Sequence, residues 1–285
     1  MDKSNSLTPA TTAIVKQAAT EPPHTSPLIH HKGDGTYLCR RCGYALFRST
    51  HKFISSCGWP SFDEEIDDRI KRLPDPDGMR TEIQCMRCDA HLGHVFVGER
   101  LTEKNLRHCV NGLALDFVAD TSVMDTEEAI VAGGCFWGVQ HLLNELPGVV
   151  LTEVGYTGGE TNEPTYRDVC SGTTGHVEAV RVVYDPARIS FESVIRYFLE
   201  IHDPTQADGQ GPDHGSQYVS VIFYYDAKQH EIAKESLDIL RDKGLNIATE
   251  LSPVAIFWPA EEYHQDYYTK NNKAPYCHRY TKRFS

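Results

Sequence analysis

The stretch EAIVAGGCFWGVQHLLNELPGVVLTEVG, residues 128–155, decides the fold of the C-terminal half of this chain. EAIVA at its start and VVLTEVG at its end are β-prone runs, which predict two strands. Residues 136–146 predict an amphipathic helix between them, because apolar side chains recur at helical spacing. These side chains are Val139, Leu142, Leu143 and Leu146. The stretch therefore predicts a strand, a helix and a strand in succession.

The same alternation continues downstream. HVEAVRVVY (176–184) and QYVSVIFYY (217–225) predict strands, and residues 190–201 predict a helix between them. The resulting β-α-β-β-α-β order is the ferredoxin-like split βαβ arrangement. A helix over 227–243 and a strand over 250–258 follow. We therefore predict a ferredoxin-like α/β sandwich for residues 129–285.

The N-terminal part has a different texture. Short β-prone runs such as TYLC, KFIS, TEIQC, HVFVG and LALDFVA alternate with turn clusters such as DPDG, a pattern typical of antiparallel sheets. We predict an antiparallel β-rich domain over residues 7–118, a disordered tail over 1–6 and a polar linker, ADTSVMDTEE, over 119–128. The fold class of the whole chain is α+β.

Composition narrows the functional classes. The chain has 285 residues, with 40 acidic and 28 basic side chains and a net charge of -12, so we expect it to repel nucleic acid and anionic membranes. The sequence lacks a long apolar run and a recognisable secretory signal, and we predict a soluble cytoplasmic protein. Reducing compartments rarely keep structural disulfides, so the nine cysteines favour metal binding or thiol chemistry.

Two C-x-x-C pairs predict a metal site. Cys39 and Cys42 form one pair, and Cys85 and Cys88 form the other. Four thiolates around a tetrahedral ion with no open position describe a structural zinc site. A redox C-x-x-C motif or four unrelated cysteines are the alternatives. A thioredoxin-like motif would lie in a βαβ context, which favours zinc.

Cys135 is the most informative of the other cysteines. It lies between two glycines and two aromatic residues, directly before the predicted helix. The positive end of the helix dipole there favours a thiolate and a cysteine pKa below about 8.5. Phe136 and Trp137 could form an apolar wall beside the sulfur. A buried cysteine at a strand-to-helix turn, with aromatic residues that only fill the core, is the alternative.

Two families resemble these residues. GGCFWG, GYTGG, YRDVCSGTTGHVEAVRVVYDP, DHGSQY and KNNKAPYC together resemble type A methionine sulfoxide reductases. LTPATTAIVKQAATEPP, SCGWPSF, TEIQC, HLGHVF and RHCVNGLALDF resemble the unrelated type B enzymes. The chain thus looks like a fusion of a type B domain with a type A domain, which reduce the two epimers of methionine sulfoxide.

The type A resemblance implies roles for residues of the C-terminal domain. Cys135 is the implied nucleophile, with Phe136 and Trp137 forming a slot for the substrate methyl group. Glu178 is the implied acid, and strand alternation places it on the same face as Val180 and Val182, where burial would raise its pKa. The remaining residues are two phenols for the oxygen, a loop carboxylate and a resolving cysteine in a polar, mobile tail: Tyr156, Tyr218, Asp213 and Cys277. Cys170 is assigned to packing.

The type B resemblance implies a second set. Cys109 is the implied nucleophile, Arg107 would favour its thiolate, and Asn111 would orient the site. His91 and His94 resemble the pair that binds and protonates the sulfoxide oxygen, a role that suits groups titrating near neutral pH. The aromatic wall and the resolving cysteine are Trp59 and Cys57.

A bifunctional reductase is the leading interpretation of these motifs. The resemblance implies that thioredoxin reopens both disulfides and that no organic cofactor is needed. A zinc-stabilised thiol redox sensor or binding module is the alternative, since such a protein would need the thiols but not the acids Glu178, His91 and His94. A thioredoxin-like disulfide oxidoreductase fits poorly, because its C-x-x-C would be used for zinc.

Overall fold

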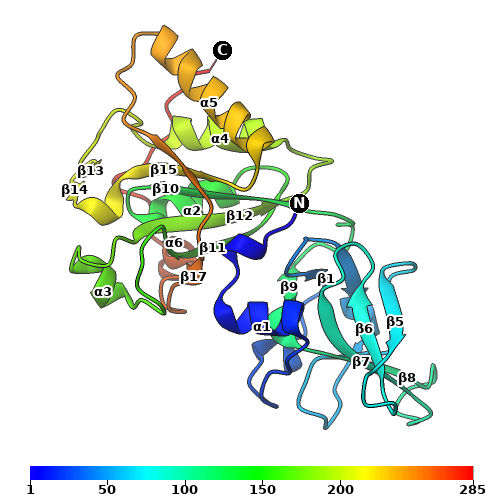
Figure 1. Ribbon diagram of the computed structural model, residues 1–285. Helices are drawn as coiled ribbons and strands as arrows, with labels where there is room; N and C mark the ends of the chain where they lie inside the picture. The colour runs from blue at the N-terminus through cyan, green and yellow to red at the C-terminus, as the bar shows by residue number, and fades with distance from the viewer. Residues whose placement is uncertain (285) are drawn as a thin grey trace. The chain divides into compact units, whose positions relative to one another are not determined.

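The computed structural model describes residues 1–284 and divides into two compact units, Met1–Thr126 and Glu127–Ser285 (Figure 1). Ser285, the last residue of the predicted C-terminal domain, lies outside the described residues. Among the helices of the described chain, none combines the length and apolar character that crossing a membrane requires. Each unit has its own hydrophobic core.

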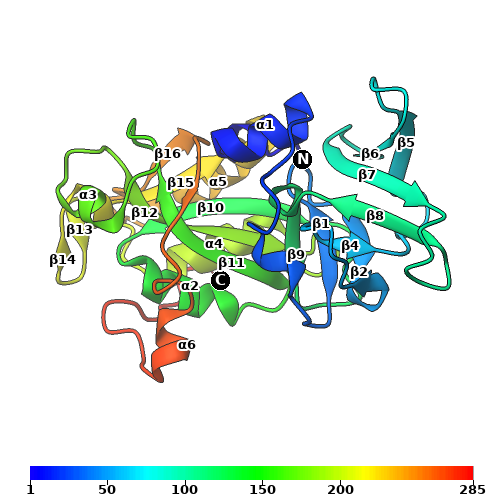
Figure 2. The same cartoon turned by 90° about the horizontal axis from the view of Figure 1, so that it is seen from below.

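A mixed six-stranded sheet forms the centre of the C-terminal unit. Its strands are β10 (Glu127–Gly133), β11 (Val149–Thr157), β12 (Val177–Tyr184), β15 (Ser220–Tyr224), β16 (Glu250–Pro253) and β17 (Trp258–Pro259). They lie in the order β16-β15-β10-β12-β11-β17, and only β15 and β16 run parallel. The inner four strands, β15-β10-β12-β11, have the order of a ferredoxin-like sheet, and Figure 2 shows β10, β12 and β11 side by side. The predicted sandwich is confirmed.

Helices cover one face of this sheet. The helices are α2 (Phe136–Asn144), α3 (Tyr166–Cys170), α4 (Phe191–Ile201), α5 (Ala227–Asp242) and α6 (Tyr267–Asn271). Val131 of β10 packs in the same core cluster as residues of α2, α4 and α5, whereas Ile130 packs in a separate cluster with Phe257. This alternation follows from the period of two along a strand. A two-stranded hairpin, β13 (Gly209–Gln210) and β14 (Asp213–His214), precedes the short turn Ser216–Tyr218.

The predicted strand over 250–258 is two strands on opposite edges of the sheet. Residues Glu250–Pro253 pair with β15, and Trp258–Pro259 pair with β11. Pro253 has no N–H to donate to a continuing ladder, so the strand ends there.

The N-terminal unit is antiparallel throughout. Its strands are β1 (Thr36–Cys39), β2 (Ala45–Arg48), β3 (Lys52–Phe53), β4 (Ser61–Phe62), β5 (Ile70–Pro74), β6 (Thr81–Cys85), β7 (His91–Val97), β8 (Leu106–Val110) and β9 (Leu115–Val118). They form sheets of order β2-β1-β9 and β3-β4-β8-β7-β6-β5. The helix α1 (Pro9–Gln17) was not predicted; Thr8 caps its N-terminus and Pro9 opens it.

Residues 1–6 differ from the disordered tail that was predicted. Ser4–Ser6 form a turn of 3-10 helix, and Lys3 is buried. The Asp2 carboxylate accepts a hydrogen bond from the Arg41 guanidinium, 3.2 Å from Nη2 to Oδ2. These contacts give the polar tail partners that its composition does not reveal. At the other end of the predicted linker, β10 already begins at Glu127.

Candidate active sites

Cys135 is the N-cap residue of α2 and is 7% exposed. Gly134, before it, has φ of 91° and lies against Gln210, where a Cβ would come within 2.3 Å, so a side chain at 134 is excluded. The Trp137 and Gly138 amides lower the pKa of Cys135, as the helix terminus predicts, but a hydrogen bond with Cys277 and burial raise it well above its ordinary value. The predicted low pKa is therefore wrong while the two thiols are paired, because their proximity disfavours a charge on Cys135.

Glu178 lies in β12 and is 2% exposed. Burial, and secondly the neighbouring Cys135, raise the pKa of this carboxyl group well above 4.5. The Phe136 N–H donates to its Oε2 at 3.0 Å. The sequence alternation places Glu178 on the helix-covered face with Val180 and Val182, as predicted. The structure thus brings a carboxyl group that favours its protonated form next to Cys135.

The two predicted phenols have different surroundings. Tyr156 is fully buried and its hydroxyl donates to Glu261 Oε2 at 2.9 Å. Tyr218 is partly buried, and burial followed by Glu178 raises its pKa. The pKa of Tyr166, at the start of α3, is likewise raised. The causes are burial, then a hydrogen bond with Cys170, and then the neighbouring Glu178 and Tyr218. The role predicted for Tyr156 stays a prediction, and the hydrogen bond that its hydroxyl donates to Glu261 competes with that role.

Sequence reasoning missed Tyr166, although it lies within the stretch YRDVCSGTTGHVEAVRVVYDP that carried the resemblance. A capping box between Thr165 and Asp168 starts the short helix that holds Tyr166. Cys170, at the end of that helix, is exposed, so its assignment to packing is wrong. Tyr166 and Tyr218 thus lie near Glu178, as does Tyr156, its register partner on β11.

Phe136 and Trp137 are held by aromatic neighbours. Their ring centroids lie 6.5 Å apart at 34°. The indole of Trp137 stacks on Tyr267, 3.7 Å between centroids, and donates its Nε1–H to His264 Nδ1 at 3.0 Å. His264 and Tyr267 were not predicted; the stretch EEYHQDYY gave no signal of its own. These contacts fix the orientation of Trp137 beside the thiol.

The segment that carries Cys277 is tied down in the structure. Tyr276 donates its hydroxyl to both oxygens of Asp213, at 3.0 and 2.9 Å. Further along, the Thr281 N–H donates to the Glu200 carbonyl at 2.7 Å and the Arg283 N–H to its carboxylate at 2.7 Å. The mobile tail predicted for Cys277 is therefore replaced by an anchored segment, because hydrogen bonds hold it on both sides of the thiol.

In the N-terminal unit, the thiols of Cys109 on β8 and Cys57 lie 3.6 Å apart. The hydrogen bond from Cys109, with others from Ser55 and Ser61, lowers the pKa of Cys57 to about 4 against the effect of burial. Contact with Cys57 and burial raise the pKa of Cys109, and Arg107 offsets this only in part. The predicted thiolate at Cys109 is wrong for this arrangement, because the contact with Cys57 disfavours a charge on Cys109. Arg107 also donates to Glu99 at 2.7 and 2.8 Å.

The two predicted histidines lie on β7, with ring centroids 5.6 Å apart. Each contacts a carboxylate: His91 Nδ1 lies 2.6 Å from Glu82 Oε1, and His94 Nε2 lies 2.5 Å from Asp75 Oδ2. Cys109 and His94 are register partners on adjacent strands. A pocket of about 110 Å³ is lined by Thr20, Trp59, Arg80, Gly93, His94, Phe96, Cys109 and Asn111. The structure therefore brings four of the predicted site residues to one cavity.

Glu21 connects two of these residues. Its backbone carbonyl accepts from Trp59 Nε1 at 3.1 Å, and its N–H donates to Asn111 Oδ1 at 3.0 Å. Asn111 also donates to the Leu92 carbonyl at 3.1 Å. The amide of Asn111 is thus held in one orientation at the cavity wall.

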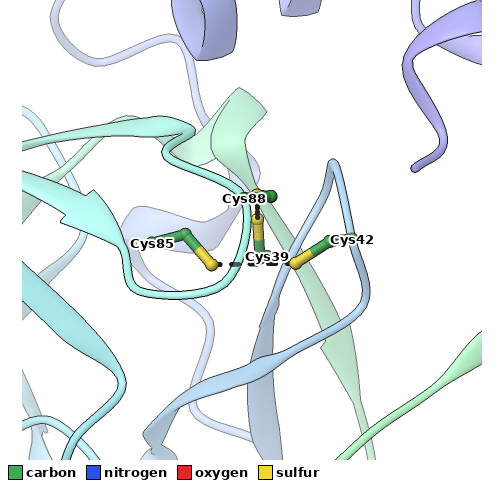
Figure 3. Close-up of side chains that lie close together, drawn as sticks. All are labelled: Cys39, Cys42, Cys85 and Cys88. Carbon is green, nitrogen blue, oxygen red and sulfur yellow. Dashed lines mark hydrogen bonds between the residues drawn. The ribbon is translucent and has the colours of Figure 1, made fainter. Parts of the chain in front are cut away.

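The four cysteines of the C-x-x-C pairs form one cluster (Figure 3), in which all four Sγ atoms lie within 4.8 Å of one another. Cys39 and Cys88 are 3.7 Å apart, as are Cys42 and Cys85. Bonds of about 2.3 Å to a tetrahedral zinc ion imply sulfur separations of about 3.8 Å. The spacing therefore fits a four-thiolate metal site.

Two equivalent turns build this cluster. The Gly43 N–H donates to the Cys39 carbonyl at 2.8 Å, and the Asp89 N–H donates to the Cys85 carbonyl at 3.0 Å. Both turn residues have positive φ, 75° for Gly43 and 59° for Asp89. The second knuckle tolerates aspartate because Asp and Asn enter this region more readily than other side chains. The long gap between the pairs is closed by the fold, as predicted.

Comparisons with known proteins agree with this geometry. The family model described as peptide methionine sulfoxide reductase matches residues 127–284, and the SelR domain model matches residues 7–119. Peptide methionine sulfoxide reductase MsrA of Halobacterium salinarum (strain ATCC 29341 / DSM 671 / R1) is 48% identical over 157 residues, which cover 54% of this chain and 89% of that protein. MsrA of Escherichia coli O139:H28 is 48% identical over 170 residues, which cover 58% and 78%.

Among solved structures, reduced Mxr1 from Saccharomyces cerevisiae matches with a TM-score of 0.51 and 36% identity. The match covers 55% of this chain and 93% of Mxr1. The chain therefore belongs to the peptide methionine sulfoxide reductase family, and it joins an N-terminal SelR domain, the type B unit, to a C-terminal type A unit.

Proposed function

We propose that the two units reduce opposite epimers of methionine sulfoxide, the R epimer in the N-terminal unit and the S epimer in the C-terminal unit. The observation that carries this proposal is the buried carboxyl group of Glu178 beside Cys135, which accompanies a second thiol at Cys277. A redox sensor needs the thiols, but it has no use for a buried acid. Reduction of a sulfoxide needs a proton donor for the departing oxygen.

In the C-terminal unit, Cys135 is the proposed nucleophile. Its sulfur attacks the sulfoxide sulfur while Glu178 gives its proton to the oxygen, and Tyr166 and Tyr218 hold that oxygen. The protonated oxygen passes from the substrate sulfur to the Cys135 sulfur as the bonds of the substrate sulfur to oxygen and to Cys135 break, so methionine leaves and Cys135 becomes a sulfenic acid. Attack by the Cys277 thiolate then forms the disulfide and releases water. The proposed roles of Phe136 and Trp137 are to enclose the substrate methyl group, and that of Asp213 is to hold Tyr276 next to Cys277.

In the N-terminal unit, Cys109 is the proposed nucleophile and Cys57 the resolving thiol. The pair shares one proton over 3.6 Å, so the charge on Cys57 can pass to Cys109 when a substrate displaces their contact. Arg107 stabilises that charge. His91 and His94 bind and protonate the oxygen, Trp59 supplies the aromatic wall, and Asn111 orients the site.

Zinc is the proposed occupant of the cluster Cys39, Cys42, Cys85 and Cys88. Four thiolates leave no open coordination position, so the ion would supply structural stability rather than catalysis. The cluster holds the ends of β1 and β6 together, and these strands belong to different sheets. The metal would thus join the two sheets of the unit.

Thioredoxin is the proposed reductant of both disulfides. Mxr1 from Saccharomyces cerevisiae, which shares the C-terminal fold, has also been solved in complex with Trx2. We further propose that residues 7–118 and 129–285 are the two catalytic domains and that residues 119–128 link them. The proposed location of the protein is the cytoplasm, where reducing conditions keep thiols available.

The test is to assay Cys135→Ser and Cys109→Ser separately on each epimer, with dithiothreitol as reductant. Cys135→Ser should abolish reduction of the S epimer and leave the R epimer unaffected, and Cys109→Ser should do the reverse. Loss of both activities from either change would refute two independent sites. Intact activity in both variants would refute Cys135 and Cys109 as the nucleophiles, and no reduction of either epimer by the wild-type protein would favour a sensor.

A further inference from the structure

His278 contacts the resolving thiol and has no role in the chemistry described so far. Its Nδ1 lies 3.0 Å from the Sγ of Cys277. Its Nε2 lies 2.7 Å from the Gly133 carbonyl oxygen, two residues before Cys135 along the chain. The side chain is 5% exposed. One imidazole thus connects the segment of the resolving thiol to the strand end that leads to the nucleophile.

The hydrogen bonds determine which ring nitrogen carries the proton. A carbonyl oxygen only accepts, so Nε2 must be the N–H that donates to Gly133. In a neutral ring Nδ1 is then unprotonated, and its lone pair faces the Cys277 thiol. Burial lowers the pKa of His278 below 6.5, although the Gly133 hydrogen bond and Asp213 act in the opposite direction. The ring is therefore neutral near pH 7 and able to accept a proton.

Glycines lie next to the imidazole of His278. A Cβ on Gly138 would come within 2.3 Å of His278 Nδ1. A Cβ on Gly134 would come within 3.4 Å of Nε2. Gly138 thus leaves room for this imidazole, whereas a Cβ on Gly134 would touch it only at an ordinary contact distance.

We propose that His278 is the catalytic base of the second half-reaction and takes the proton from Cys277 as that thiol attacks the sulfenic acid. This rests on the proposed function of the C-terminal unit. The Cys277 S–H bond breaks and its proton moves to Nδ1. The resulting thiolate attacks the Cys135 sulfur, an S–S bond forms, the S–O bond breaks, and hydroxide leaves to become water on taking a proton from the imidazolium. Cys277 is oxidised and the Cys135 sulfur is reduced, so no further reagent is needed.

This role makes the two half-reactions separable. Release of methionine depends on Cys135 and Glu178, whereas closure of the disulfide depends on the Cys277 thiolate, which is the attacking species in such exchanges. Removal of the base should slow only the second step. The expected effect is about 10²-fold, the lower end of what general bases contribute.

His278→Gln provides the test, because glutamine can place an amide N–H near the position of Nε2 but has no base in place of Nδ1. In a single turnover with the S epimer and no reductant, the rate of methionine release should stay unchanged. Formation of the Cys135–Cys277 disulfide, followed by mass spectrometry, should slow about 10²-fold, and a dimedone-reactive sulfenic acid should accumulate. His230→Gln, a change in α5 at a histidine that contacts Tyr224, is the matched control and should alter neither step.

An unchanged disulfide rate in His278→Gln would overturn the proposal, and so would equal slowing of both steps, which indicates a merely structural histidine. The wild-type protein gives an independent check through the ¹⁵N shifts of His278. An Nε2–H tautomer, or an imidazolium paired with a thiolate, agrees with the proposal, whereas a neutral Nδ1–H tautomer overturns it. If the wild type released no methionine, the proposed function itself would fail, and this outcome is distinct from the others.

Discussion

The two units place their proton donors and their thiols in different ways. In the C-terminal unit a single buried carboxyl group, Glu178, lies beside Cys135, the proposed nucleophile, and burial raises its pKa well above 4.5. In the N-terminal unit two histidines each contact a carboxylate on an adjacent segment. A carboxyl group must be buried to serve as an acid at neutral pH, whereas histidine titrates there already. The carboxyl group of Glu178 is therefore buried, whereas the two histidines need no such burial to act as proton donors.

The two units also differ in the structural elements that hold their thiols. Cys57 and Cys109 contact each other in the β-rich unit that also contains the cysteine cluster. In the other unit, Cys135 is the N-cap residue of a helix, and Cys277 lies on a segment held by hydrogen bonds. The N-terminal unit has a cysteine cluster able to hold a metal ion in addition to its core, whereas the C-terminal unit has its hydrophobic core alone among the described residues. Variants that affect one unit should leave the other unchanged.

Removal of one cluster thiol should have the largest effect. Cys85→Ser should release the metal and unfold the N-terminal unit, because structural zinc sites contribute about 10–16 kcal/mol of apparent binding free energy. Reduction of the R epimer should be lost and that of the S epimer retained. Metal analysis and thermal melting followed by circular dichroism measure this.

Cys170→Ser is the matched control for the loss of a thiol, since Cys170 is exposed. It should change neither metal content nor melting. Unchanged metal content and melting in Cys85→Ser would contradict a structural metal site.

Glu178→Gln should come next, with a loss of about 10²–10⁴-fold in kcat for the S epimer. Glutamine keeps an oxygen that can accept from the Phe136 N–H but cannot give up a proton. Reduction of the R epimer by the same protein is the internal control. A small loss for the S epimer would show that the proton comes from another group.

The raised pKa of Glu178 also predicts two effects of pH. The rate with the S epimer should fall as pH rises through this raised pKa, because the acid loses its proton. The folded state binds this proton more tightly than the unfolded state, so the free energy of unfolding should decrease as pH rises from about 4.5 toward the folded pKa. Glu178→Gln should remove that decrease, and urea unfolding at several pH values measures it.

The success of sequence reasoning was uneven, for physical reasons. Hydrophobic periodicity predicted the ferredoxin-like order and the face that Glu178 shares with Val180 and Val182, because side-chain alternation on a strand is fixed by geometry. The choice between Tyr156 and Tyr166 could not be made in this way. It depends on the hydrogen bond from Tyr156 to Glu261, a contact between residues far apart in sequence.

The protonation of the thiols was likewise beyond the sequence. A helix terminus beside Cys135 and a guanidinium beside Cys109 both favour a thiolate. The structure places a second thiol against each, and the pairing reverses the direction of the pKa shift. Only the folded chain reveals that a second thiol lies against each proposed nucleophile, Cys277 against Cys135 and Cys57 against Cys109.

Replacement of each tyrosine by phenylalanine should show which of Tyr156 and Tyr166 donates to the substrate oxygen. Tyr166→Phe removes a donor near Glu178 and should lower kcat for the S epimer about 10²-fold, as loss of one oxyanion donor does. Tyr156→Phe should leave kcat near the wild-type value and lower the free energy of unfolding by about 1–2 kcal/mol, because Glu261 loses a hydrogen bond. The reverse ranking of the two kcat values would restore Tyr156 as the phenol of the site.

The smallest predicted effect concerns the carboxylates behind the two histidines. Asp75→Asn keeps a hydrogen-bond partner for His94 Nε2 but removes the negative charge beside the ring. We expect about tenfold lower kcat for the R epimer, a part of the ~10²–10⁴-fold that a general acid contributes. Glu82→Gln, the same change behind His91, should have a weaker effect, because His94 rather than His91 is among the residues that line the cavity with Cys109. If Glu82→Gln had the stronger effect instead, the proton donor of the N-terminal unit would be His91, and His94 would serve to bind the oxygen.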